Sequence, residues 1–214
     1  MVVDLLGHKI QLLPQKALFF YGFNTLVIAD LHLGKVNHFR KSGIPVPDKA
    51  NDDNTGRLID CLQMTKASRA IFLGDLFHSH YNYEWEVLGQ VRKHFADVAF
   101  DLVLGNHDIL SEQQYDRNRL QVFDQISLGP FSLTHEPLTG EMDDRYNIAG
   151  HIHPGVRLRG TARQSLMLPC FYFGKRQALL PAFGSFTGLA RISPRKEDRI
   201  YAIAENRIVE LNYD

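Results

Sequence analysis

Short apolar runs, each ending in a polar or glycine-containing cluster, most constrain how this chain of 214 residues can fold. Their length and their content of Val, Ile, Leu and Phe predict buried strands. In the first two thirds of the chain the predicted strands cover residues 25–29, 70–73, 98–104, 131–134 and 146–149. Apolar residues at helical spacing predict helices over residues 54–66 and 85–95. Strands that alternate with helices indicate an α/β sheet with right-handed crossovers.

The last third of the chain has a different character, because its predicted strands follow one another with few helices between them. These strands cover residues 166–173, 177–183, 200–204 and 207–211, with a hairpin turn at Glu205-Asn206. A chain of this length can bury one sizeable core and is short for two. We therefore expect a single domain over residues 1–214 with an α/β (α+β) fold, in which two packed mixed β-sheets are flanked by helices.

Charge and cysteine content bear on partners and compartment. Lys plus Arg equals Asp plus Glu at 24 each, so only a local basic patch would bind a polyanion. We interpret Cys61 and Cys170 as reduced thiols of a cytoplasmic protein, with one disulfide between them as the alternative. The N-terminal residues lack a signal-peptide pattern. No apolar run reaches the ~18 residues that span a bilayer, so we expect no membrane partner.

The strands predicted in the first two thirds of the chain are followed by side chains that can bind a metal ion. In chain order these residues are Asp30, His32, Asp75, Asn106, His135, His151 and His153. Taken singly, each has a structural explanation as a cap, a tight turn or a satisfied histidine. Ligands bind beyond the carboxyl ends of strands in open α/β sheets. Because these residues recur at strand ends, we predict that they form one site.

The residue types at these strand ends indicate the chemistry of the site. Carboxylate, imidazole and amide oxygen together suit manganese, iron or zinc better than calcium. The set contains no cysteine, which argues against a structural zinc. Two divalent ions roughly 3.5–4 Å apart can neutralise a phosphate ester, generate a hydroxide and hold the in-line geometry. We therefore expect a phosphoesterase with two divalent metal ions.

The ordered set resembles the calcineurin-like metallophosphoesterase superfamily. The motifs that carry the resemblance are Asp30-x-His32, Gly74-Asp75, Gly105-Asn106-His107-Asp108, His135 and Gly150-His151-x-His153. It implies one ion held by Asp30, His32 and His153, and a second held by Asn106, His135 and His151. It implies that Asp75 bridges the two ions. It also implies that His107 is a catalytic histidine, oriented by Asp108, which stabilises the phosphoryl charge or protonates the leaving oxygen.

Further segments resemble the DNA ligase-associated metallophosphoesterases, and this match runs through most of the chain. The segments are residues 30–35, 39–40, 43–47, 74–78, 168–171 and 180–187. The resemblance implies a manganese-dependent phosphodiesterase or endonuclease in bacterial DNA repair, functionally associated with a DNA ligase and a helicase. Residues 74–78 also resemble double-strand-break repair nucleases, which implies that His78 lies near the scissile phosphate.

Basic residues supply the remaining candidate substrate contacts. Lys35 and Arg40 follow the first metal motif. Arg157 and Arg159 belong to residues 155–176, which contain five basic residues and no acidic residue. Such residues can contact phosphate. A solvated strand or helix surface is the alternative for each of them, and a solvated loop histidine is the alternative for His78.

Three functions are consistent with the sequence. The leading hypothesis is a two-metal phosphodiesterase acting on nucleic acid. The first alternative changes the substrate to a small cyclic nucleotide, a dinucleotide or a phosphomonoester. The second alternative is a scaffold protein that has this fold and performs no hydrolysis. The full ligand set and His107 count against a scaffold, which needs neither.

Overall fold

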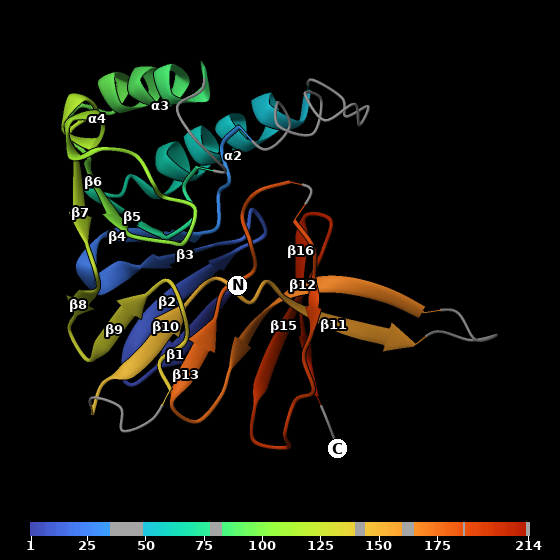
Figure 1. Cartoon of the computed structure of the whole chain (residues 1–214). Helices are drawn as coiled ribbons and strands as arrows, with labels where there is room; N and C mark the ends of the chain where they lie inside the picture. The colour runs from blue at the N-terminus through green and yellow to red at the C-terminus, as the bar shows by residue number, and fades with distance from the viewer. Residues whose placement is uncertain (35–48, 78–82, 140–143, 160–164, 186, 213–214) are drawn as a thin grey trace.

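A computed structural model describes residues 1–34, 49–77, 83–139, 144–159, 165–185 and 187–212 (Figure 1). Two packed β-sheets and a layer of helices make up the described part of the chain. This arrangement confirms the predicted fold class. The single domain over residues 1–214 stays a prediction. Three of the predicted substrate contacts, Lys35, Arg40 and His78, lie outside the described residues.

The first sheet contains seven described strands, which follow one another in chain order. They are β1 (Val2–Leu5), β2 (His8–Leu13), β3 (Ala17–Phe20), β4 (Thr25–Ala29), β5 (Arg69–Leu73), β6 (Ala99–Val103) and β7 (Leu120–Phe123). A short 3-10 helix, η1 (Tyr21–Phe23), connects β3 to β4. Strands β1 to β4 pair antiparallel, whereas β4 to β7 pair parallel. The carboxyl ends of β4, β5 and β6 therefore meet at one edge.

The second sheet is also mixed. Its order is β14 (Ala190–Arg191), β11 (Pro154–Arg159), β12 (Ser165–Phe173), β13 (Gln177–Leu179), β10 (Tyr146–Ala149), β9 (Phe131–Thr134) and β8 (Ile126–Leu128). A terminal hairpin joins β12 and consists of β15 (Arg199–Ala204) and β16 (Arg207–Leu211). Strands β9 and β10 are parallel, so their carboxyl ends also point the same way.

The described α-helices are α2 (Lys49–Thr65), α3 (Tyr83–His94) and α4 (Glu112–Arg117). They cover the face of the first sheet that is turned away from the second sheet (Figure 1). Among the described residues, no helix has the length and apolar character that crossing a membrane requires.

Alternation along the central strands builds a core on each face of the first sheet. In β4, Leu26 and Ile28 belong to the cluster that contains the helix residue Trp85. The intervening Val27 belongs to a second cluster with Phe131 of the other sheet. Successive strand side chains point to opposite faces, so a continuous apolar run is what a strand buried on both sides requires.

Most of the predicted strands are confirmed, and those over residues 25–29, 131–134, 146–149 and 207–211 agree with the structure at both ends. The predicted helix over residues 54–66 begins earlier, at Lys49. Both cysteines are free, in agreement with the prediction of reduced thiols, and the structure shows that both are buried. The N-terminal strands β1 to β3 were not among the predicted elements.

The strand predicted over residues 177–183 is wrong beyond Leu179, where β13 ends. Leu180 still donates its N–H to the Ala149 carbonyl of the second sheet at 2.8 Å. Pro181 has no N–H with which to continue the ladder. Phe183 then donates its N–H to the Ala29 carbonyl of the first sheet at 2.8 Å. The segment therefore crosses from the end of β10 in the second sheet to the end of β4 in the first sheet.

We predict that Phe131→Ala lowers the free energy of unfolding by about 3–5 kcal/mol, the usual effect of a large-to-small change in a core. Phe131 is fully buried, and its ring centroid lies 5.3 Å from that of Phe20 in the first sheet. Val209→Ala on β16 is the control, because Val209 is 46% exposed. Chemical denaturation measures both variants. A loss under about 1 kcal/mol at Phe131 would show that this contact does not hold the sheets together.

Candidate metal centre

The candidate ligands follow the carboxyl ends of strands from both sheets. After β4, the Asp30 N–H donates to the Gly74 carbonyl at 3.3 Å, and the His32 N–H donates to the Asp75 carbonyl at 2.8 Å. The segment after β4 therefore runs alongside the segment after β5. From the second sheet, the Gly150 N–H donates to the His135 carbonyl at 3.0 Å. Main-chain hydrogen bonds thus hold neighbouring strand ends together in each sheet.

The backbone at these positions is unusual. Five candidate ligands have positive φ angles of 47° to 63°, namely Asp30, His32, Asp75, His151 and His153. Positive φ is uncommon for residues other than glycine, and each such residue costs about 1–3 kcal/mol. Strain of this kind persists where the surrounding structure imposes it and concentrates at functional sites.

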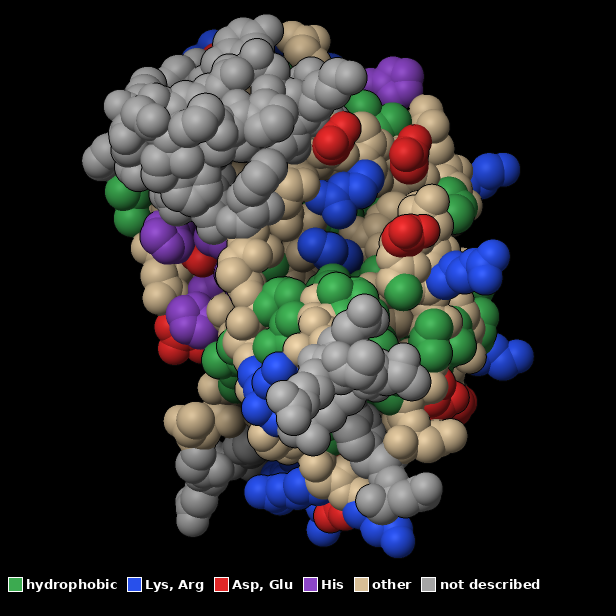
Figure 2. Space-filling view, turned by 90° about the vertical axis from the view of Figure 1, so that its right-hand side faces the viewer, with side chains coloured by type: hydrophobic (Ala, Val, Ile, Leu, Met, Phe, Trp, Pro, Cys, Tyr) green, Lys and Arg blue, Asp and Glu red, His purple; other side chains and the backbone are tan. Residues whose placement is uncertain are grey.

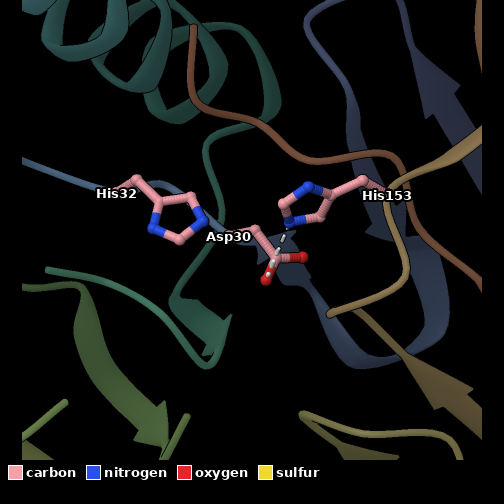
Figure 3. Close-up of side chains that lie close together, drawn as sticks. All are labelled: Asp30, His32 and His153. Carbon is pink, nitrogen blue, oxygen red and sulfur yellow. Dashed lines mark ion pairs between the residues drawn. The ribbon is translucent and has the colours of Figure 1, made fainter. Parts of the chain in front are cut away.

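Asp30, His32 and His153 form the first group of potential ligands. One donor atom from each residue lies within 4.8 Å of the others. The two imidazoles approach the Asp30 carboxylate from different sides (Figure 3), and His153 Nε2 lies 3.5 Å from Asp30 Oδ1. The structure thus brings together the three residues that the resemblance assigned to one ion.

The Asp30 carboxylate tests whether a cation fits here. The residue is only 1% exposed. Its Oδ2 accepts the His151 N–H at 2.9 Å, whereas its buried Oδ1 accepts no hydrogen bond. A buried carboxylate oxygen is costly unless it is hydrogen-bonded, paired with a charge or bound to a metal. A divalent cation among these donors would supply the missing partner, so the residues fit a metal ion.

The second group contains Asp30, Asp75 and His135, again within 4.8 Å of one another. His135 Nε2 lies 3.6 Å from Asp75 Oδ1, and His32 Nε2 lies 3.8 Å from Asp75 Oδ2. The two oxygens of Asp75 therefore face histidines of different groups. His135 Nδ1 lies 3.2 Å from the Leu73 carbonyl, which can only accept. This contact places the proton on Nδ1 and leaves Nε2 able to bind a metal.

His151 lies beside this second group. Its Nδ1 is 3.1 Å from His135 Nε2, and the two rings are nearly perpendicular at 83°. A shared cation or a single N–H donor would satisfy two ring nitrogens at this distance. The structure therefore brings together His135 and His151, two of the three residues that the resemblance assigned to the second ion. Asp30 is a member of both three-residue groups described above.

These donors occur on a chain whose family is recognisable. The model of the calcineurin-like phosphoesterase family matches residues 23–159. The chain belongs to this family. It is a metal-dependent phosphoesterase, and the matched region contains every candidate metal ligand.

Solved structures that are similar to this phosphoesterase include a nuclease and a protein of unknown function, whereas no curated protein matches it. Nuclease MPE from Pseudomonas putida is 29% identical with a TM-score of 0.82, and the similarity covers 99% of each chain. A protein of unknown function from Aquifex aeolicus is 20% identical with a TM-score of 0.43, over 60% of this chain and 78% of that chain.

The loop after β6 carries the remaining candidates of the phosphoesterase. The His107 N–H donates to Asp75 Oδ1 at 3.0 Å. The exposed His107 ring lies 5.7 Å from the His32 ring, centroid to centroid. Asn106 is exposed, and its side chain makes no hydrogen bond to a described residue. The structure therefore brings His107 to the mouth of the site and leaves the neighbouring Asn106 exposed on the same loop.

Asp108 acts on the main chain of this loop. Its two oxygens accept the Gly105 N–H at 2.9 Å and the Phe77 N–H at 3.2 Å. Burial raises the pKa of the Asp108 carboxyl to about 7, although both N–H donors oppose the shift. Asp108 thus ties the loop that carries His107 to the segment after β5.

The predicted basic contacts lie farther along the chain. Strand β11 begins immediately after His153. Arg157 on this strand is exposed, and its Nη2 donates to Ser165 Oγ at 2.8 Å. Arg159 pairs with Ser165 at the end of β11, and its side chain lies outside the described part. Among the described residues, the Arg157 side chain therefore forms a hydrogen bond only to the neighbouring strand β12.

Sequence reasoning did not assign the segment from Phe183 to Ser185 to the site. The Gly184 N–H donates to the Asp30 carbonyl at 3.0 Å. A Cβ atom at Gly184 would lie 2.6 Å from the Leu31 carbonyl oxygen, so a larger residue would push the segment away. Pro181 and Gly184 within an otherwise apolar run were the available signal, because both residues weaken a strand assignment.

We predict that Gly150→Ala lowers the affinity for divalent metal, because an added Cβ would lie 2.6 Å from Asp30 Oδ2 and 2.8 Å from the Ala29 Cβ. Gly188→Ala is the matched control, since nothing lies within 4 Å of a Cβ there. Elemental analysis and metal titration measure both variants. Equal metal content and affinity in the two variants would show that the Asp30 carboxylate does not hold the metal.

Proposed function

We propose that this protein is a two-metal phosphodiesterase that cleaves nucleic acid. The observation that carries the proposal is that two carboxylates, Asp30 and Asp75, lie between histidines of two neighbouring groups of potential ligands. Asp30 belongs to both groups, and the oxygens of Asp75 face His32 on one side and His135 on the other. The similarity to a nuclease over 99% of both chains supports nucleic acid as the substrate.

In this proposal Asp75 bridges the two metal sites. One ion is held by Asp30, His32 and His153, and the other by Asn106, His135 and His151. When bound, two divalent ions would offset the negative charge of the phosphodiester and lower the pKa of an attacking water.

His107 is proposed to act on the substrate. Its imidazole is exposed at the mouth of the site, and its own N–H is held by Asp75. From there it can stabilise charge on the phosphoryl group or protonate the oxygen that leaves. Asp108 is a positioning residue in this proposal, because it fixes the main chain of the loop through Gly105 and Phe77.

We infer manganese as the favoured metal, with iron or zinc as alternatives, because imidazole nitrogens dominate the ligand set. The buried free thiols Cys61 and Cys170 support a cytoplasmic location, where thiols stay reduced. A setting in bacterial DNA repair, with functional association with a DNA ligase and a helicase, rests on the sequence resemblance. The contacts proposed for Lys35, Arg40, His78, Arg157 and Arg159 have the same basis.

We predict that chelation abolishes turnover and that Mn²⁺ restores it better than Mg²⁺, which prefers oxygen ligands and retains its waters. The assay compares aryl monoesters, aryl diesters, cyclic nucleotides, and single- and double-stranded DNA. We expect diesters to be cleaved faster than monoesters, and DNA to be cleaved.

The Asp75→Asn variant, purified in the same way, controls for contaminating nucleases in this assay. Full turnover by protein that contains no detectable metal would contradict the metal mechanism. Turnover of aryl esters or cyclic nucleotides without any cleavage of DNA would contradict the proposed substrate class.

We predict that His107→Ala retains its metal ions and loses about 10²–10⁴-fold in DNA cleavage, the usual contribution of general acid catalysis. Hydrolysis of a nitrophenyl diester should fall much less, because nitrophenolate leaves as a stable anion. His94→Ala on the exposed end of α3 is the control histidine. Loss of a metal ion would make His107 a ligand. An equal loss on both substrates with metals retained would rule out a role in protonating the leaving oxygen.

A further inference from the structure

A pocket of about 740 Å³, lined by two basic and two acidic residues, lies at the same edge of the first sheet as the candidate metal centre. It is bounded by the β2–β3 turn, helix α2, strand β12 and the β15–β16 turn. Figure 2 looks onto this side of the molecule and shows basic side chains in its middle, with acidic side chains beside them, and histidines at its left edge. Two cations line the pocket, Lys16 from the β2–β3 turn and Arg57 from α2.

Strand register places one wall of the pocket beside Asp30. Strands β3 and β4 pair antiparallel with Ala17 opposite Ile28. Lys16, which precedes Ala17, is therefore next to the end of β4, the strand that Asp30 follows. Neighbouring strands lie ~4.8 Å apart, so the backbones of Lys16 and of the metal-site segment are close neighbours.

The opposite wall of the pocket belongs to the second sheet. Pro169 of β12 lines the pocket and pairs with Gly155 of β11. Strand β11 begins directly after His153, a proposed metal ligand. The pocket is thus bordered on both sides by strands adjacent to segments that carry proposed ligands.

Arg57 lines the pocket, and its guanidinium is fixed by contacts with α2 and with the segment around Phe183. Its Nη2 donates to Asn54 Oδ1 at 2.6 Å and to the Phe183 carbonyl at 2.7 Å, and its guanidinium lies 4.8 Å from the Phe183 ring centroid. Phe183 belongs to the segment whose next residue, Gly184, contacts Asp30. Arg57 therefore contacts the same short segment as the metal centre does. Its Nε and Nη1 donors have no partner among the described residues.

The Lys16 ammonium has no hydrogen-bond or ion-pair partner among the described residues. Burial, and then repulsion from Arg57, lower the pKa of the Lys16 ammonium to about 8, so the group still carries its proton at neutral pH. Asp60 and Glu205 also line the pocket, but both are exposed and neither forms an ion pair with Lys16 or Arg57. The nearby Asp53 carboxylate opposes the lowering of the Arg57 pKa that burial causes, but it forms no ion pair with Arg57. Half-buried cations without an ion-pair partner are unfavourable until an anion joins them.

We propose that this pocket binds a phosphate group of a nucleic-acid substrate outside the bond that is cleaved, with the Lys16 ammonium and the Arg57 guanidinium as its binding groups. The inference rests on the proposed function, because it takes the polymer that occupies the metal centre as its ligand. A free phosphate shares the same chemistry, and the experiment separates the two sources. The volume of the pocket is enough for a nucleotide unit.

The experiment compares Lys16→Met with Lys9→Met in the manganese-loaded enzyme. Methionine keeps the apolar stem of Lys16 and removes its charge. Lys9 is an exposed lysine on β2, outside the pocket, so its variant controls for the loss of one positive charge. Arg57 is left intact, because its hydrogen bonds hold α2 to the Phe183 segment.

We expect Lys16→Met to raise KM for single-stranded DNA on the order of tenfold. The slope of log(kcat/KM) for DNA against log salt should become shallower by about one, because one fewer phosphate contact is made. Lys16→Arg retains the cation and should recover most of the affinity. Lys9→Met should match the wild type in KM and in salt slope. Thermal melts check folding, and removal of the repulsion from Arg57 should leave Lys16→Met no less stable than the wild type.

Wild-type KM and salt slope in Lys16→Met, on an enzyme that does cleave DNA, would overturn this inference and leave the proposed function standing. A wild-type enzyme that hydrolyses an aryl diester but cleaves no DNA would overturn both. The remaining measurement is the effect of inorganic phosphate on the melting temperature. If it raises the melting temperature of the wild type but not of Lys16→Met, while KM for DNA is unchanged, the pocket binds free phosphate and the assignment to the polymer is wrong.

Discussion

The buried carboxylate of Asp30 is the constraint on which the rest of the site depends. Its main chain is bonded to Gly74 and to Gly184, and its side chain accepts the His151 N–H. Four chain segments therefore meet at one residue. One carboxylate oxygen is left buried without a hydrogen bond, and such a group is tolerated only where a positive charge offsets it. In a metal-dependent phosphoesterase, divalent ions supply that charge. The burial of Asp30 is therefore favourable only when a cation lies among the candidate ligands that surround it.

The two sheets divide the chemistry between them. The first sheet supplies the carboxylates and the loop of His107 from the ends of β4, β5 and β6, whereas the second sheet supplies His135, His151 and His153. Neither sheet holds a complete group of candidate ligands, so the packing between the sheets sets how these side chains lie relative to one another. The contact of Phe20 with Phe131 and the crossing from Leu180 to Gly184 hold that packing in place. Positive φ angles at five of the candidate ligands indicate that the surrounding structure imposes these positions against local preference.

Much of this fold was predictable from local patterns. The central strands are buried on both faces and therefore read as continuous apolar runs, whose ends are sharp because polar residues follow them. The N-terminal strands were harder to predict, because β1 and β2 mix exposed and buried residues over only four and six positions. The start of α2 at Lys49 lies in a polar stretch, where no apolar periodicity marks the helix. The overextended strand at residues 177–183 shows the opposite error, because an apolar segment that crosses between sheets has the same composition as a strand.

The sequence by itself determined the family, the types of metal-binding side chain and their positions at strand ends, since a polar residue after an apolar run is a local property. Only the tertiary structure decided which donors meet. It placed Asp30 in both groups, left the Asn106 side chain exposed and directed Asp108 to main-chain N–H groups. It also brought Lys16 and Arg57 into one pocket. These outcomes depend on strand register and on contacts between segments far apart in the chain, such as the 121 residues that separate His151 from Asp30. Local periodicity carries no information about such contacts.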